Sequence, residues 1–241
     1  MKIKQIITIS IFICMFCISC SNTLLKDVPS EDNGSGILLS FDDYSPANWV
    51  AYQYLFEKYN AKVTFFVALS SPTSFCFDAE SRGHEIGYHT IHHCHLPELS
   101  RTTFYEETVL SVNNFRDQGI GLGAFAYPYG EWEPWMHEEL LQYYDIVRGF
   151  EKDFYIYEKD RMKNTYIASI SIDNIVYKNN REYERNISRM LKLAKMKENN
   201  IVPITSHRID DSDWGITPER LEYLLRSCKE LNLRFYTYKD L

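Results

Sequence analysis

The segment "GILLSFDD" (residues 36–43) is a short apolar run that ends in two adjacent aspartates. A continuous apolar run of this kind, followed directly by charged residues, is typical of a strand that is buried on both faces. In folds built on parallel strands, catalytic groups gather where strands end and loops begin. The segment therefore predicts an opening strand that places Asp42 and Asp43 at a functional edge.

Downstream of this strand, segments with strand character alternate with segments with helix character. The first expected helix has Ser45 at its capping position and Pro46 at its start, and the last one begins with Thr217 and Pro218. Strand patterns fall at 62–69, 84–89, 123–130, 145–150, 167–173, 201–207 and 233–238, and helix patterns at 45–60, 101–119, 134–144 and 181–200. This alternation predicts one α/β domain with seven or eight parallel strands, either an open sheet or a barrel.

Polar residues recur at the ends of the expected strands, although they come from distant parts of the chain. They are Asp42, Asp43, His89, His93, the Tyr-Pro-Tyr-Gly turn at 127–130, Arg148, Asp173 and His207. Because the carboxyl ends of parallel strands share one side of the fold, we expect these side chains to meet. Their common position favours a single functional site.

Histidines are concentrated in "GYHTIHHCHL" (residues 87–96). His89 and His93 are four residues apart, and in a helical turn that spacing places both imidazoles on one face. Two imidazoles and the carboxylate of Asp43 leave coordination positions open for water, which is typical of catalytic zinc or a similar divalent ion. The alternative is a cluster of exposed histidines that binds no metal.

The first 20 residues have the features of an export signal. Lys2 and Lys4 precede an uncharged apolar run of about 14 residues, which is shorter than the roughly 20 needed to span a bilayer. The run ends in "CISCSN", and Cys20 followed by small polar residues resembles a lipoprotein processing site. We expect a signal peptide at 1–20 and a bacterial envelope protein anchored through lipidated Cys20. Cleavage near Ser19, with a secreted or periplasmic product, is the alternative.

The net charge of the chain and an expected flexible tether at 21–36 limit which molecules the protein can bind. Residues 21–36 are polar and contain Gly, Ser, Asp and Pro, which predicts a flexible tether before a domain at 37–241. The formal charge is −7, and loss of Lys2 and Lys4 with the leader takes it to −9. An acidic surface argues against nucleic acid and against an anionic membrane face as partners. We therefore expect a neutral or cationic substrate and a membrane contact only through the lipid.

Four motifs together resemble those of the polysaccharide deacetylases, carbohydrate esterase family four with the NodB-type homology domain. They are "SFDD" (40–43), "HEIGYHTIHHCHL" (84–96), "AYPYG" (126–130) and "TSHR" (205–208). The resemblance covers about residues 36–210 and extends toward the C-terminus. It implies a distorted (β/α) barrel of about seven strands and a hydrolase of carbon–nitrogen bonds other than peptide bonds.

The resemblance also implies roles by position. Asp43, His89 and His93 are the implied metal ligands, Asp42 the general base and His207 the general acid. Zinc is the expected ion, and cobalt or nickel suits the same ligands. A metal polarises the substrate carbonyl, a base takes the proton of water, and an imidazole protonates the leaving amine.

Further residues are expected to support this chemistry. The backbone N–H of Tyr129 is expected to stabilise the oxyanion. Asp173 ends a strand and is a candidate to orient the acid histidine, and Trp214 is expected to form an apolar wall. Trp132 and Trp135 lie near the expected mouth of the barrel and are candidates for stacking on sugar rings.

The third motif departs from the family pattern, in which an arginine pairs with the base carboxylate. Ala126 occupies the position of that arginine. Asp42 would then lack a cation that favours its charged form. Arg148, at the end of the strand expected at 145–150, is the candidate replacement.

Three functions follow from these observations. The first is a metal-dependent deacetylase that removes N-acetyl, or alternatively O-acetyl, groups from a polysaccharide or oligosaccharide at the cell envelope. The second is a non-catalytic or weakly active metal-containing lipoprotein that binds glycans, and the missing arginine supports it. The third is an envelope protein whose histidines only bind or buffer metal. Asp42 and His207 count against the third, because simple metal binding needs neither.

Overall fold

The structure is a computed structural model that describes residues 31–241. The expected signal peptide, the lipidation site at Cys20 and most of the expected tether lie outside the described residues. In the described part of the chain, no helix combines the length and the apolar character needed to cross a membrane.

The last residues of the expected tether contact the domain. Asp32 pairs with Arg234 at 2.9 Å, and the Ser35 hydroxyl donates a hydrogen bond to the Lys197 carbonyl at 2.7 Å. The first strand then begins at Gly36. The ordered domain therefore includes a few residues that precede the expected boundary.

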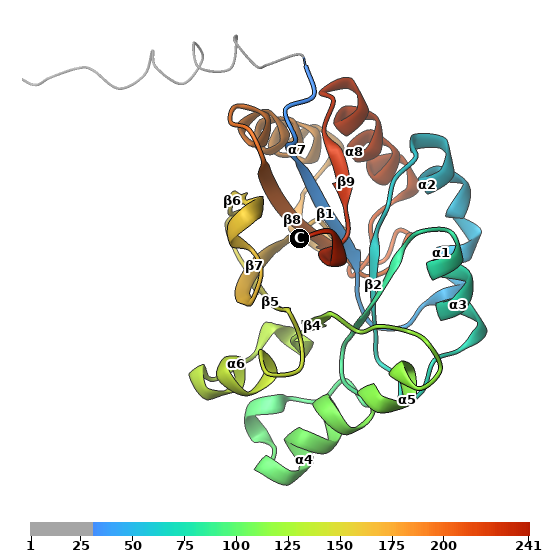
Figure 1. Cartoon of the computed structure of the whole chain (residues 1–241). Helices are drawn as coiled ribbons and strands as arrows, with labels where there is room; N and C mark the ends of the chain where they lie inside the picture. The colour runs from blue at the N-terminus through green and yellow to red at the C-terminus, as the bar shows by residue number, and fades with distance from the viewer. Residues whose placement is uncertain (1–30) are drawn as a thin grey trace, which may run out of the picture.

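Seven parallel strands close into a barrel (Figure 1). They are β1 (Gly36–Phe41), β2 (Thr64–Val67), β3 (Glu85–Tyr88), β4 (Ala124–Ala126), β5 (Ile146–Glu151), β7 (Thr165–Ser171) and β8 (Asn200–Ser206). Closure comes from β8, which pairs with β1 from Gly36 opposite Ile201 to Phe41 opposite Ser206. The predicted single α/β domain with a barrel of about seven strands is confirmed.

Two short strands fill gaps where barrel strands separate. β9 (Arg234–Tyr236) pairs with the first half of β1, whereas β2 pairs only with Ser40 and Phe41 at its end. In the same way, β6 (Tyr157–Glu158) pairs antiparallel with the start of β8, whereas β7 pairs with residues nearer the end of that strand. The barrel is therefore split at its N-terminal end on both sides of the β1–β8 pair, and an extra strand covers each split.

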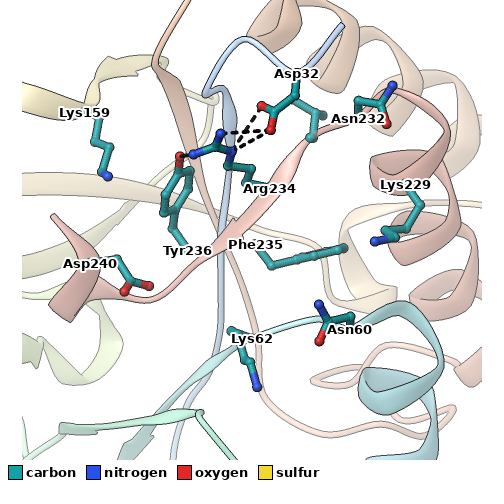
Figure 2. A pocket seen from close by; sticks show the side chains of 11 residues that line it. Asp32, Asn60, Lys62, Lys159, Lys229, Asn232, Arg234, Phe235, Tyr236 and Asp240 are labelled. Atoms are coloured by element: carbon teal, nitrogen blue, oxygen red, sulfur yellow. Dashed lines mark hydrogen bonds and ion pairs between the residues drawn. The ribbon is translucent and has the colours of Figure 1, made fainter. Parts of the chain in front are cut away.

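A cavity of about 520 Å³ lies along β9 at this N-terminal end (Figure 2). Its charged lining residues are Asp32, Lys62, Lys159, Lys229, Arg234 and Asp240. None of the residues expected at the functional site lines it. The site must therefore be sought at the other end of the barrel.

Side chains alternate between the inside of the barrel and the surrounding helices. In β1, Ile37 and Leu39 belong to the core between strands and helices, and Leu38 packs inside the barrel. The strand period of two places Ser40, and then Asp42, on the inner side as well. Along this line the interior changes from apolar to polar toward the carboxyl ends of the strands.

Helices lie around the barrel (Figure 1). In the described residues they are α1 (Pro46–Ala51), α2 (Gln53–Tyr59), α3 (Ser74–Ser81), α4 (Arg101–Tyr105), α5 (Val112–Arg116), α6 (Pro134–Leu140), α7 (Asn180–Lys195) and α8 (Pro218–Glu230). The single helix expected over 101–119 is instead divided by a π-helical turn, η2 (Glu106–Leu110). The helix α3 and the strand β6 were not expected from the sequence.

Candidate active site

Asp42 and Asp43 follow β1 directly and occupy different environments. Adjacent residues of a regular strand face opposite sides, but Asp43 has a left-handed backbone (φ 75°). This conformation is uncommon for residues other than glycine. It allows Asp43 to line a cavity at the C-terminal end of the barrel, while Asp42 remains fully buried. The two aspartates are therefore placed for different tasks.

A buried ion pair joins Asp42 to Arg148 on β5. Nη2 of Arg148 lies 2.5 Å from Oδ1 and 2.6 Å from Oδ2 of Asp42, and neither side chain has exposed surface. On the neighbouring strand β4, the residue in register with Arg148 is Ala126. The third motif has alanine where the family pattern has arginine, and Arg148 supplies a cation from the paired position on β5.

His89 is buried at the end of β3, and its hydrogen bonding determines which nitrogen faces the cavity. Nδ1 lies 2.8 Å from the carbonyl oxygen of Ala126, and because a carbonyl oxygen only accepts, Nδ1 carries the proton. Nε2 then faces the cavity, 3.6 Å from Oδ1 of Asp43. Such a hydrogen bond on the other ring nitrogen is usual for metal-binding histidines.

The loop after β3 brings His93 to the same point. This loop is not the helical turn that the spacing suggested, because residues 89–93 are non-helical and both Thr90 (φ 68°) and His93 (φ 52°) have left-handed backbones. The two imidazole centroids nevertheless lie 4.9 Å apart, and Nε2 of His93 lies 3.1 Å from Oδ1 of Asp43. The side chains meet through a strained loop and not through helical periodicity.

The three side chains fit a divalent metal. Asp43, His89 and His93 each offer one ligand atom, and these atoms lie within 4.8 Å of one another. Burial acts to raise the pKa of Asp43, but the two histidines outweigh it and hold that pKa well below its usual range. Oδ1 of Asp43 is buried and has no hydrogen-bond partner among the described residues. One carboxylate oxygen and two imidazole nitrogens are a donor set that zinc accepts.

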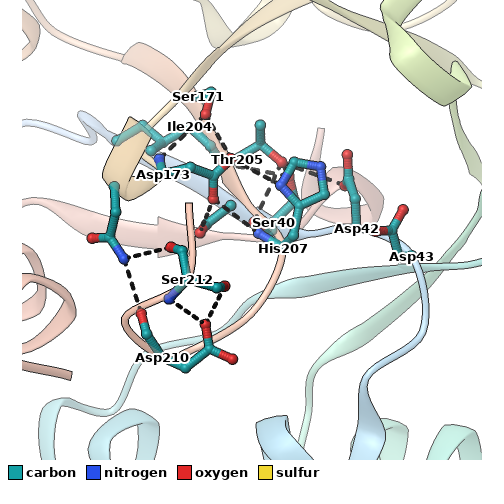
Figure 3. Close-up of polar contacts among 12 residues, drawn as sticks. Ser40, Asp42, Asp43, Ser171, Asp173, Ile204, Thr205, His207, Asp210 and Ser212 are labelled. Atoms are coloured by element: carbon teal, nitrogen blue, oxygen red, sulfur yellow. Dashed lines mark hydrogen bonds and ion pairs between the residues drawn. The ribbon is translucent and has the colours of Figure 1, made fainter. Parts of the chain in front are cut away.

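His207 follows β8, and Asp173 fixes its orientation (Figure 3). Nδ1 of His207 lies 2.8 Å from Oδ2 of Asp173, whose Oδ1 accepts hydrogen bonds from the Ser206 hydroxyl at 2.6 Å and the His207 amide at 3.3 Å. Burial alone lowers the pKa of His207, but the hydrogen bond and charge of Asp173, with the charges of the two aspartates after β1, raise it to about 9. The imidazole is therefore protonated at neutral pH, and its Nε2 can donate.

These groups meet at a cavity of about 540 Å³ at the C-terminal end of the barrel. Its lining consists of Asp43, His89, His93, Tyr129, Phe150, Glu151, Ser171, His207 and Trp214. Tyr129 belongs to the turn η3 (Pro128–Gly130), has a left-handed backbone (φ 57°) and packs its ring against His93. Aromatic rings pack beside the titratable groups of this lining, and the volume lies in the usual range of small-molecule sites.

The comparison with protein families agrees with this geometry. Residues 30–143 match the family model described as polysaccharide deacetylase. This part of the chain is similar to the polysaccharide deacetylases. The match contains both aspartates after β1 and both histidines that face Asp43, and it ends before Arg148, Asp173 and His207. No curated protein sequence matches the chain.

Solved structures of deacetylases share the fold. A peptidoglycan deacetylase from Bacillus subtilis is 16% identical, with a TM-score of 0.56 over 87% of this chain and 91% of that one. A chitin deacetylase from the fungal pathogen Colletotrichum lindemuthianum is 17% identical, with a TM-score of 0.60 over 85% of each chain. An esterase domain of a multidomain xylanase from the hindgut metagenome of Trinervitermes trinervoides is 18% identical, with a TM-score of 0.56 over 86% and 89%. At these identities the likeness establishes the fold.

The tryptophans expected to stack on sugar, Trp132 and Trp135, do not line the cavity at the C-terminal end of the barrel. Trp132 packs against His137 and Tyr166, at centroid distances of 4.1 and 5.3 Å. Trp135 packs against Phe104 on α4, at 4.8 Å. Both tryptophans are close to the third motif in the sequence, but neither ring lines the cavity.

Other cavity residues were missed or only partly expected. Phe150 follows Arg148 by two positions on β5, so the strand period already places both on the inner face. Ser171 precedes Asp173 by the same interval. Glu151 ends β5, and no sequence pattern identifies it. Trp214 lines the cavity as expected, with its ring centroid 5.7 Å from that of His207.

Proposed function

We propose that this protein is a metal-dependent deacetylase that hydrolyses N-acetyl, or alternatively O-acetyl, groups on a polysaccharide or oligosaccharide. The observation that carries the proposal is the convergence of Asp43, His89 and His93 in one cavity with a protonated His207. A simple metal-storage site needs no proton donor held by a buried aspartate. The family match of residues 30–143 supports the same reaction.

Asp43, His89 and His93 would hold a divalent ion, with zinc the expected choice and cobalt or nickel compatible. Such an ion supplies Lewis-acid polarisation of a carbonyl group. The backbone N–H of Tyr129 is the proposed donor to the carbonyl oxygen as negative charge develops there. The acetyl group is then attacked by water at its carbonyl carbon.

Two proton transfers complete the proposed reaction. Asp42 accepts the proton of the attacking water, and Arg148 balances the charge of this buried carboxylate before the transfer. When the carbon–nitrogen bond breaks, Nε2 of His207 donates a proton to the leaving amine. Asp173 accepts from Nδ1 throughout, which keeps the donating nitrogen toward the cavity.

The cellular location is part of the proposal. The charged start, the apolar run and Cys20 support export with a lipid anchor at the cell envelope, and a secreted or periplasmic form is the alternative. The substrate is then a glycan outside the cytoplasm. The net charge of −7 agrees with a neutral or cationic polymer.

The competing function is a glycan-binding protein with a metal and little or no catalysis. Its main support was the missing arginine of the third motif. The ion pair between Arg148 and Asp42 removes that support, because a cation accompanies the proposed base. We therefore favour the enzyme.

Acetate release tests the proposal directly. The mature chain is incubated with N-acetylglucosamine oligomers, peptidoglycan and acetylated xylan, with and without a chelator. We expect release from at least one N-acetylated glycan, loss of release with chelator, and recovery when Zn²⁺ is restored. Stoichiometric metal with no acetate from any of these glycans would contradict the enzyme and support the glycan-binding alternative.

A further inference from the structure

Glu107 packs against the loop that carries His93, although it lies on a different segment of the chain. Its Oε2 accepts hydrogen bonds from the backbone N–H groups of Ile91 at 3.1 Å and His92 at 3.0 Å. Its Oε1 lies 2.6 Å from Nδ1 of His92. One buried carboxylate therefore contacts three polar groups of a single short loop.

The π-helical turn η2 explains how a glutamate comes to face this loop. Consecutive residues of an α-helix point about 100° apart, so a surface helix rarely buries three in a row. In η2, however, Glu107, Thr108 and Val109 are all buried. The hydroxyl of Tyr144 donates to the carbonyl of Thr108 and ties the turn to the domain. π-helical turns are rare and are often found at functional sites.

The loop needs support because its backbone is strained. Thr90 is β-branched, and a left-handed φ of 68° is an outlier for such a residue. His93 is also left-handed, and its amide donates to the Thr90 hydroxyl at 2.9 Å. Strained conformations persist only where the surrounding contacts over-determine them. Glu107 supplies these contacts to Ile91 and His92, the two residues between the strained ones.

We propose that Glu107 is a positioning residue for the metal site, because it holds residues 90–93 in the conformation that directs His93 at Asp43. The proposal rests on the proposed function, since it concerns the same ligand set. The carboxylate acts through the loop and not as a ligand: its contacts are the amides of Ile91 and His92, the His92 ring and the Cys94 thiol. Without it, the loop relaxes toward negative φ and the imidazole of His93 leaves the other two ligands.

The test is the Zn²⁺ affinity of the metal-free full chain, measured by calorimetric titration. Glu107→Ala is expected to weaken the affinity by about 10- to 100-fold, as is usual when a partner of the ligand shell is lost. Glu107→Gln should keep most of the affinity, because the amide oxygen still accepts both backbone hydrogen bonds. Glu106→Ala is the matched control: this neighbouring glutamate is exposed and, in the described structure, makes no hydrogen bond to the loop. Its affinity should equal that of the wild type.

Amide hydrogen exchange of the metal-free chain gives a second readout that needs neither metal nor activity. Exchange at Ile91 and His92 should be faster in Glu107→Ala and unchanged in Glu106→Ala. Glu107→Leu, which keeps the packing without an acceptor, gives the same comparison if the alanine variant does not fold. A folded variant with wild-type affinity and wild-type exchange would overturn the positioning role. A wild type that binds Zn²⁺ but releases no acetate would instead contradict the deacetylase, and the role of Glu107 would be unaffected.

Discussion

The two halves of the site are built in different ways. The ligand half, Asp43, His89 and His93, lies on loops, uses left-handed backbone at Asp43 and His93, and faces the cavity. The proton-transfer half consists of strand-end residues whose partners are buried: Asp42 with Arg148, and His207 with Asp173. The ligand half lies wholly inside the segment that matches the family model, whereas most of the proton-transfer half lies beyond it.

We propose that Arg148 serves the Asp42 carboxylate from the strand next to the one that carries the arginine in the family pattern. Ala126 and Arg148 are paired in register on neighbouring strands, and both face the interior of the barrel. Side chains at paired positions start a few ångströms apart, so a long guanidinium can reach the same carboxylate from either strand. A metal ligand has less freedom, because its donor atom must lie within bonding distance of one ion.

Removal of a side chain of the ligand half should have the largest effect, and the effect should fall on Zn²⁺ binding. Asp43→Ala or His93→Ala is expected to abolish stoichiometric Zn²⁺ binding, because two remaining donors do not form a tight site. Calorimetric titration of the metal-free chain measures this. His95→Ala is the control, because His95 bonds to Glu131 and faces no ligand atom of the site. Undiminished binding in both ligand variants would show that the ion is held elsewhere.

Asp42→Asn should impair the proton-transfer half of the site and leave the ligand half intact. The variant is expected to bind Zn²⁺ like the wild type and to lose about 10²- to 10⁴-fold in acetate release, the usual contribution of a general base. Paired metal titrations and acetate assays on the same preparation measure both properties. Full activity in this variant would show that the assigned mechanism is wrong.

Arg148→Met should reveal the cost of an unpaired buried charge. The variant leaves the Asp42 carboxylate buried without its cation, and we expect a loss of about 3–5 kcal/mol in the free energy of unfolding. Urea unfolding measures the loss. The double variant Arg148→Met with Asp42→Asn should recover part of it, since no charge is then buried. A loss below about 1 kcal/mol in the single variant would mean that the pair is solvated in solution.

The pH dependence of stability should report on His207. Its pKa is raised in the folded chain to about 9, so the extra stability is fully present below about pH 6.5 and is lost as the pH rises through 9. For the metal-free chain we expect a loss on the order of 3 kcal/mol between these values. Urea unfolding at several pH values measures it, and Asp173→Asn should flatten the dependence. An equally steep dependence in that variant would place the titrating group elsewhere.

The sequence predicted the strand-end positions of the site well, because parallel strands bring their carboxyl ends together whatever the details of the helices between them. Arg148 became a candidate on that ground alone, from its place at the end of an expected strand. The i, i+4 spacing of His89 and His93 predicted their proximity but not its cause, since spacing cannot distinguish a helical turn from a strained loop. The strand β6 was not predicted, because it has only two residues and so short a segment shows no alternation of apolar and polar residues.

The π-helical turn was missed for a related reason. The apolar stripe through Phe104, Thr108, Val112 and Phe115 fits an uninterrupted helix, and one extra residue in a turn changes that pattern little. Trp132 and Trp135 were placed at the cavity because of their neighbours in the sequence, but they pack against α-helical and barrel side chains. Aromatic content alone does not distinguish a core ring from a binding ring.

The closure of the barrel has a consequence for the order of folding. β1 is the first strand of the domain, and it pairs over its whole length with β8, the last of the seven barrel strands in the sequence. Contacts between such distant segments form slowly, and the barrel cannot close until β8, which ends at Ser206, has left the ribosome. A nascent chain of this topology cannot close its barrel during most of its synthesis. That delay agrees with the export that we propose for this protein.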